Sequence, residues 1–113
     1  MKCFVYFYNT DNTRLINADC LVPNEYYLRV FIGSYSYIEA TFFSTDENNK
    51  VNDILIQPVP SLFDTKETRM IYWKNLACKM ELHGIDELDV NNFCNELTEE
   101  IKEAFSNYKL NIH

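Results

Sequence analysis

Carboxylates dominate the chemistry that this sequence could perform. The stretch ELHGIDELDVNNFCNELTEEIKE (81–103) holds eight acidic residues against one base, Lys102. Its charge of −7 equals the formal net charge of the whole chain, so the other ninety residues sum to zero. Such a block either keeps a helix face solvated or is steered toward a basic protein surface.

A second group of carboxylates suggests catalysis. Asp19, Glu39 and Asp53 fall on expected strands, where they could converge on one sheet face and hold a catalytic metal ion. Sites of that kind usually include a lysine, whereas Arg29 is the only base on those strands. A minimal carboxylate-dependent nuclease is therefore the third of three functional hypotheses.

No other catalytic set stands out. The only histidines are His83 and His113, and neither has a serine or cysteine partner in a recognisable motif. The chain has only two glycines, too few for a phosphate-binding loop. We therefore expect a protein that is not an enzyme and has no catalytic residue, cofactor or bound metal.

The four cysteines are spaced unlike zinc ligands. Cys3, Cys20, Cys78 and Cys94 include no C-x-x-C pair, and Cys20 and Cys94 fall on apolar faces, which favours reduced thiols in the core. The apolar run at the N-terminus is too short for a signal peptide or a membrane span. Both observations predict a cytoplasmic protein.

The charge balance disfavours direct binding of nucleic acid or of an anionic membrane. The chain has 10 basic and 17 acidic residues, and the bases are not clustered. Its eight tyrosines could stack on bases, but no electropositive groove would bring a strand to them.

The first half of the chain has the patterns of β-strands. The segment 3–8 is apolar throughout, and the segments 16–22, 25–32, 35–43 and 51–57 alternate or are rich in β-branched and aromatic residues. Their short connections predict an antiparallel meander of about five strands.

A helix is expected over 65–83. Met70, Trp73 and Met80 recur at helical spacing, Asp64 resembles an N-cap, and Gly84 stands where a left-handed C-cap is wanted. The alternative is a pair of strands through RMIYW and KMELHGI that would extend the sheet.

A second helix is expected from about Val90 to Tyr108, because its apolar residues form a single stripe. Asp86 or Asp89 would supply the N-cap. On a helical wheel, one flank of this helix carries Glu96, Glu99, Glu100 and Glu103.

These elements predict one α+β domain over 1–113 with two layers. A meander (1–57) would be followed by a two-helix segment (64–110) that packs on one sheet face. The other face would then be exposed and rich in tyrosine, and Tyr26, Tyr35 and Tyr37 are candidates for a second interface, such as that of a homodimer.

The leading hypothesis is a small acidic inhibitor that occupies a basic, nucleic-acid-binding surface of another protein, such as a nucleic-acid-binding enzyme. Phage or mobile-element anti-defence proteins, such as anti-CRISPR proteins, and toxin immunity proteins are the classes considered. The expected contacts are the four helix glutamates together with Asp86, Glu87 and Asp89. The second hypothesis is a homo-oligomeric accessory or structural domain that pairs through the tyrosine-rich face.

Overall fold

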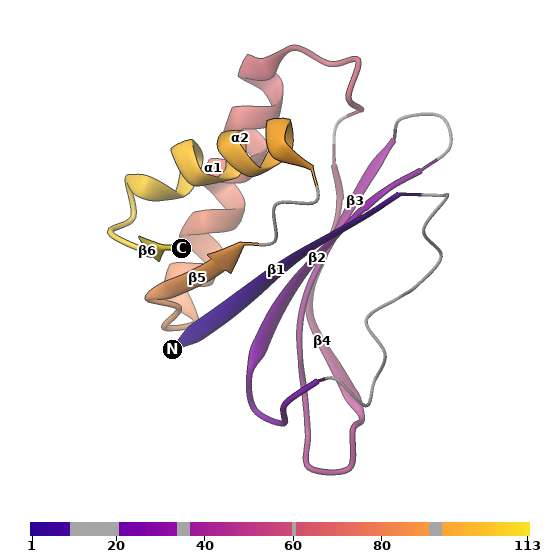
Figure 1. The fold of residues 1–113 in the computed structure, drawn as a ribbon, viewed down its shortest axis with the longest axis vertical. Coiled ribbons are helices and arrows are strands. Elements are labelled where there is room, and N and C mark those ends of the chain that lie inside the picture. Colours follow the sequence, from indigo (N-terminus) through magenta and orange to yellow (C-terminus); the bar gives the residue numbers. More distant parts are fainter. Residues whose placement is uncertain (10–20, 34–36, 60, 91–93) are drawn as a thin grey trace.

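Six strands and two helices make up the described part of the chain (Figure 1). The computed structural model describes residues 1–9, 21–33, 37–59, 61–90 and 94–113. In chain order the elements are β1 (Lys2–Asn9), β2 (Tyr26–Ile32), β3 (Ile38–Thr45), β4 (Val51–Val59), α1 (Lys66–Leu82), β5 (Glu87–Val90), α2 (Asn95–Ser106) and β6 (Asn111–Ile112).

The strands form one mixed sheet in the order β4-β3-β2-β1-β5-β6. β2, β3 and β4 are antiparallel neighbours, but β1 runs parallel to both β2 and β5, and β5 runs parallel to β6. The α+β class is therefore confirmed, whereas the purely antiparallel meander is wrong. The expected strand over 16–22 lies outside the described residues as far as residue 20, and Leu21 and Val22 belong to no strand.

Both helices cover the same face of the sheet, called the inner face here (Figure 1). Strand alternation directs every second side chain of β1, β2 and β3 toward the helices. The resulting core joins Cys3, Val5, Phe7, Leu28, Val30, Ile38, Ala40 and Phe42 to Trp73, Leu76, Met80, Leu97, Ile101 and Phe105 of the helices.

A smaller cluster lies on the opposite, outer face of the sheet. Tyr27 and Phe43 are opposite each other on β2 and β3, stack with ring centroids 5.6 Å apart, and are buried together with Leu21. Phe4 and Tyr6 of β1 pack against them. One end of the outer face is therefore already covered by the chain itself.

α1 confirms the helix expected at 65–83 and excludes the alternative pair of strands. Its N-cap is Thr65, whose side chain accepts a hydrogen bond from the Thr68 amide, rather than Asp64. Gly84 has a φ of 79°, the left-handed conformation expected of it. None of the helices in the described ranges is long and apolar enough to cross a membrane.

The expected second helix is wrong at its beginning. α2 starts only at Asn95, after an N-cap residue, Cys94, that makes no side-chain capping bond. The segment that contains Asp86 and Asp89 instead forms β5 and the turn before it, so neither residue caps the helix. Four residues are too few for periodicity to reveal a strand, and Val90 happens to fit the apolar stripe of α2.

Candidate functional site

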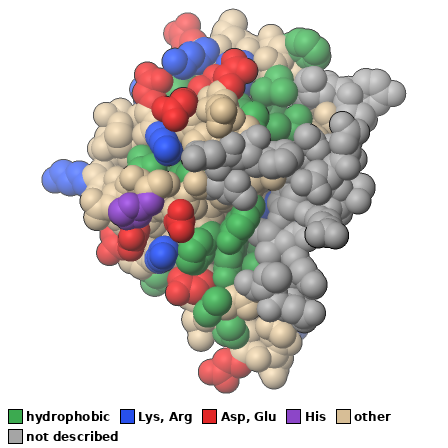
Figure 2. Space-filling model, viewed as in Figure 1, with side chains coloured by type: hydrophobic (Ala, Val, Ile, Leu, Met, Phe, Trp, Pro, Cys, Tyr) green, Lys and Arg blue, Asp and Glu red, His purple; other side chains and the backbone are tan. Residues whose placement is uncertain are grey.

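The acidic stretch 81–103 does not form one surface. β5 places Leu88 and Val90 in the core, so Glu87 and Asp89 point to the outer face of the sheet, away from α2. α2 carries its glutamates on the helical side of the molecule, where acidic and basic side chains are interspersed (Figure 2). The seven predicted contact residues therefore do not form one continuous surface.

Glu100 is a structural residue. It is only 4% exposed, and its carboxylate accepts hydrogen bonds from Nε of Arg69 at 3.1 and 3.0 Å and from Nη2 of the same guanidinium. The indole Nε1 of Trp73 also donates to it, at 3.4 Å. A carboxylate held in this way is not available to another protein, so the prediction that Glu100 binds a partner is wrong.

Arg69 fixes the loop before α1 as well as α2. Its Nη1 donates to the backbone carbonyls of Leu62, at 3.2 Å, and of Asp64. Hydrogen bonding to Glu100 raises the pKa of Arg69, even though burial opposes this, so the guanidinium remains charged. One side chain thus joins the loop, α1 and α2.

Three further carboxylates of the stretch have partners. Glu103 pairs with Lys66 at 3.2 Å, and Glu87 with Nε2 of His113 at 2.9 Å. Asp86 accepts a hydrogen bond from the α-ammonium group of Met1, and this contact lowers the pKa of Asp86. These contacts are exposed and individually weak.

Glu96 and Glu99 remain fully available. Both are exposed on α2, and within the described residues neither has an ion-pair partner. They border a depression of about 330 Å³ between the first turns of α1 and α2, whose lining has four acids and two bases. The lining consists of Lys66, Arg69, Glu96, Glu99, Glu100 and Glu103. We call the exposed part of this lining, Glu96, Glu99, Glu103 and Lys66, the acidic seam.

Phe63 lies in the loop before α1 and is 85% exposed. It stands between Leu62 and Asp64, whose carbonyls are both held by Arg69, and its own amide donates to Oγ of Ser61 at 3.1 Å. A large apolar side chain is therefore presented on an anchored backbone. Aromatic residues, phenylalanine among them, are enriched in protein interfaces relative to the rest of the surface.

The three tyrosines predicted for a second interface differ in their surroundings. Tyr26 lies on the inner face, where it stacks on Phe42 at 5.3 Å and packs against the core, so its assignment to an exposed face is wrong. Tyr35 lies outside the described residues. Tyr37 is 44% exposed and its ring lies 6.0 Å from that of Phe31 on the outer face.

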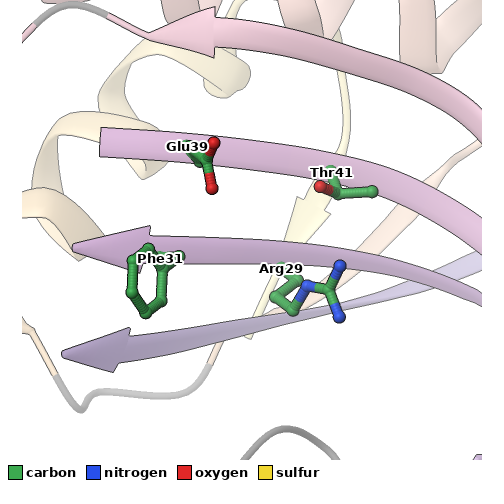
Figure 3. Close-up of a pocket in the computed structure, with 4 residues that line it drawn as sticks. All are labelled: Arg29, Phe31, Glu39 and Thr41. Carbon is green, nitrogen blue, oxygen red and sulfur yellow. The ribbon is translucent and has the colours of Figure 1, made fainter. Parts of the chain in front are cut away.

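A cleft of about 220 Å³ lies on the outer face between β2 and β3 (Figure 3). Its lining is a two-by-two block in which Arg29 is opposite Thr41 and Phe31 is opposite Glu39. The guanidinium of Arg29 lies over the ring of Phe43, 5.4 Å from its centroid, and points away from Glu39. Neither charge has an ion-pair partner in the part of the chain that the structure describes.

The carboxylates considered for a nuclease are not brought together. Asp53 is opposite Phe43, four residues along β3 from Glu39, so the two acids lie roughly 13 Å apart along the strand. Asp19 lies outside the described residues. No group of three His, Cys, Asp or Glu residues in the described ranges is placed to hold a metal ion.

The cysteines differ in their surroundings. Cys3 is buried in the core, where desolvation raises the pKa of its thiol, and Cys94 is half-buried against the same core. Cys78 is exposed on α1, and Cys20 lies outside the described residues. The three described cysteines are free thiols.

Comparisons with known proteins give no relative: no family model, no curated protein and no solved structure matches this chain.

Sequence reasoning missed Arg69, Lys66 and Phe63. A signal for the first was present, since Arg69 precedes Trp73, Leu76 and Met80 at helical spacing and so occupies the apolar stripe of α1. Glu100 likewise stands on the wheel about 40° from the apolar stripe of α2, closer than the other three glutamates. A base and an acid in such positions indicate a buried pair.

Proposed function

We propose that this protein binds a basic surface of another protein through the acidic seam, and acts as a non-enzymatic inhibitor. The observation that carries the proposal is the pair of exposed carboxylates Glu96 and Glu99, which have no ion-pair partner among the described residues, together with the anchored, exposed Phe63 in the loop before α1. The target class that fits best is a nucleic-acid-binding protein, because such proteins gather lysine and arginine on one surface. Anti-defence or toxin immunity proteins are roles of this kind.

The binding mechanism follows from charge and burial. Glu96 and Glu99 attract the partner over a long range and then accept hydrogen bonds from its arginine or lysine side chains. Phe63 supplies apolar area and a ring face on which a guanidinium can stack. Because Arg69 holds the loop in place before binding, little conformational entropy is lost when the complex forms.

Binding through the acidic seam is tested by reversing the charges of Glu96 and Glu99. Glu96→Lys with Glu99→Lys should abolish binding, whereas Glu47→Lys with Glu81→Lys should leave it nearly unchanged. The second pair makes the same change in net charge at exposed positions away from the seam. Each protein is used to capture partners from a bacterial lysate, the captured protein is identified and purified, and its dissociation constant is measured at two salt concentrations.

We expect the wild type and the control to bind the same basic protein, more weakly at high salt. Glu96 lies in the first turn of α2, where its charge also favours the helix dipole, so the stability of each variant is measured by urea denaturation. Undiminished binding by a folded Glu96→Lys, Glu99→Lys protein would refute the role of the seam. Capture of an acidic protein would refute the proposed class of partner.

A further inference from the structure

The outer face of the sheet offers a cation and an anion that have no partner in the described part of the chain. Arg29 is half-buried and Glu39 is exposed, and they occupy diagonal positions of the block formed with Phe31 and Thr41. Diagonal neighbours on antiparallel strands lie about 7–8 Å apart. At this separation the long side chain of Arg29 could reach the carboxylate of Glu39. Its guanidinium nevertheless points away from that carboxylate (Figure 3).

The aromatic part of this face is held in a defined position. An ideal Cβ on Gly33 would stand 1.8 Å from Cε1 of Tyr37, so the Tyr37 ring can lie where it does only because residue 33 is a glycine. The amide of Gly33 also donates to the carbonyl of Tyr37 at 2.8 Å. The chain thus uses one of its two glycines to place a half-exposed tyrosine beside Phe31.

A second copy of the chain complements this arrangement. In a symmetric dimer the two outer faces pack against each other around a two-fold axis that lies between the sheets. Suppose that this axis runs over the midpoint of the line from Arg29 to Glu39 and is perpendicular to that line. Arg29 then faces the partner's Glu39, and Glu39 faces the partner's Arg29. The other diagonal of the block then lies along the axis, so Phe31 meets the partner's Phe31.

We propose that the protein forms a homodimer through the outer face, with two symmetric ion pairs between Arg29 and Glu39 of the partner subunit around a centre formed by Phe31 and Tyr37. A second copy of the chain supplies ion-pair partners for both charges, which have none among the described residues, and covers the exposed ring of Tyr37. The free area is limited, since Tyr27 and Phe43 are already buried under Leu21. We therefore expect dimerisation that depends on protein concentration.

Charge reversal at the two positions tests the dimer in solution. Arg29→Glu makes both charges of the face negative and Glu39→Arg makes both positive, so each variant should be monomeric where the wild type is dimeric. An equimolar mixture of the two variants should dimerise, and so should the double variant Arg29→Glu, Glu39→Arg. Sedimentation velocity over a series of concentrations, with far-UV circular dichroism as a check of folding, measures each case.

The matched control is Glu81→Arg, which makes the same substitution at an exposed glutamate of α1, away from both the outer face and the acidic seam. We expect it to dimerise like the wild type, whereas each single variant at the outer face should weaken dimerisation about tenfold or more. The proposal is overturned if the wild type is monomeric at every concentration, if either single variant dimerises normally, or if the mixture stays monomeric. The experiment requires no target protein, so its result is independent of the proposed inhibitory function.

Discussion

Glu100 and Glu99 are adjacent glutamates with opposite roles. Glu99 faces water, whereas Glu100 is enclosed by Arg69 and Trp73 and joins α1 to α2. Removing one member of a buried ion pair leaves the other charge desolvated, which is more costly than losing the attraction itself. A count of charges cannot distinguish two such residues, but a measurement of stability can.

We predict that Glu100→Ala lowers the free energy of unfolding by about 3–5 kcal/mol. The reason is that Arg69 would remain buried and charged without its carboxylate partner, and the loop around Leu62 and Asp64 would lose part of its anchor. Urea denaturation followed by tryptophan fluorescence is suitable, because Trp73 donates to the same carboxylate.

Glu99→Ala is the control, with an expected change within about 0.5 kcal/mol, as is usual for exposed residues. If Glu100→Ala unfolds no more easily than Glu99→Ala, then the Arg69–Glu100 pair does not stabilise the protein. The Glu100 assignment to a partner-binding surface would in that case have to be restored.

At the scale of elements, the two glycines serve two different needs. Gly84 ends α1 with a φ of 79°, and a Cβ there would meet no atom within 4 Å. Gly33 ends β2 with no positive φ, and its constraint is the Tyr37 ring. Gly84 is therefore required by its backbone conformation, whereas Gly33 is required because a larger residue would collide with the Tyr37 ring.

We predict that removal of the Tyr37 ring changes the loss of stability caused by Gly33→Ala but not the loss caused by Gly84→Ala. Gly33→Ala should displace the ring and cost at most about 1–3 kcal/mol, as for other overpacked sites, and Tyr37→Ala in the same chain should relieve that cost. Gly84→Ala should destabilise by about 1 kcal/mol through the backbone, with or without Tyr37. A double-mutant cycle by urea denaturation measures both couplings, and equal coupling of Tyr37 to the two glycines would contradict the assignment.

The longer elements could be predicted from sequence, because each contains several periods of its own pattern. The strands near 3–8, 25–32, 35–43 and 51–57 and the helix at 65–83 were found in this way. β5 and β6 were missed because four and two residues contain too little pattern. The candidate site was harder still, since periodicity can place Arg69 and Glu100 near the apolar stripes of their helices but cannot show that two residues 31 positions apart meet each other.

At the scale of the whole molecule, β1 is the element that determines the topology. It lies between β2 and β5, both of them parallel to it, so the beginning of the chain is bonded to residues more than eighty positions away. The local sequence pattern can identify such a strand, but it does not show which strands lie next to it. The short connections alone therefore predicted a meander. The sheet also separates the acidic seam on the inner side from Arg29 and Glu39 on the outer side.

The two proposed surfaces can therefore operate together. A dimer joined through the outer faces would carry one acidic seam on each of its two opposite sides. Such a dimer could bind two copies of a basic protein, or two sites on one, and gain affinity from the second contact wherever the spacing allows.

The central position of β1 has a consequence that can be measured by amide hydrogen exchange. We predict the slowest exchange in β1 over 3–5, where the strand is bonded on both sides and Cys3 and Val5 are buried in the core. β4 is an edge strand bonded only to β3, and the two-residue β6 is the opposite edge, so both should open by local fraying and exchange faster. NMR spectra recorded after transfer into D₂O compare all three strands in one sample. If the amides of β1 exchanged as fast as those of β4, β1 would not be the centre of the sheet, and the separation of the acidic seam from Arg29 and Glu39 by the sheet would lose its basis.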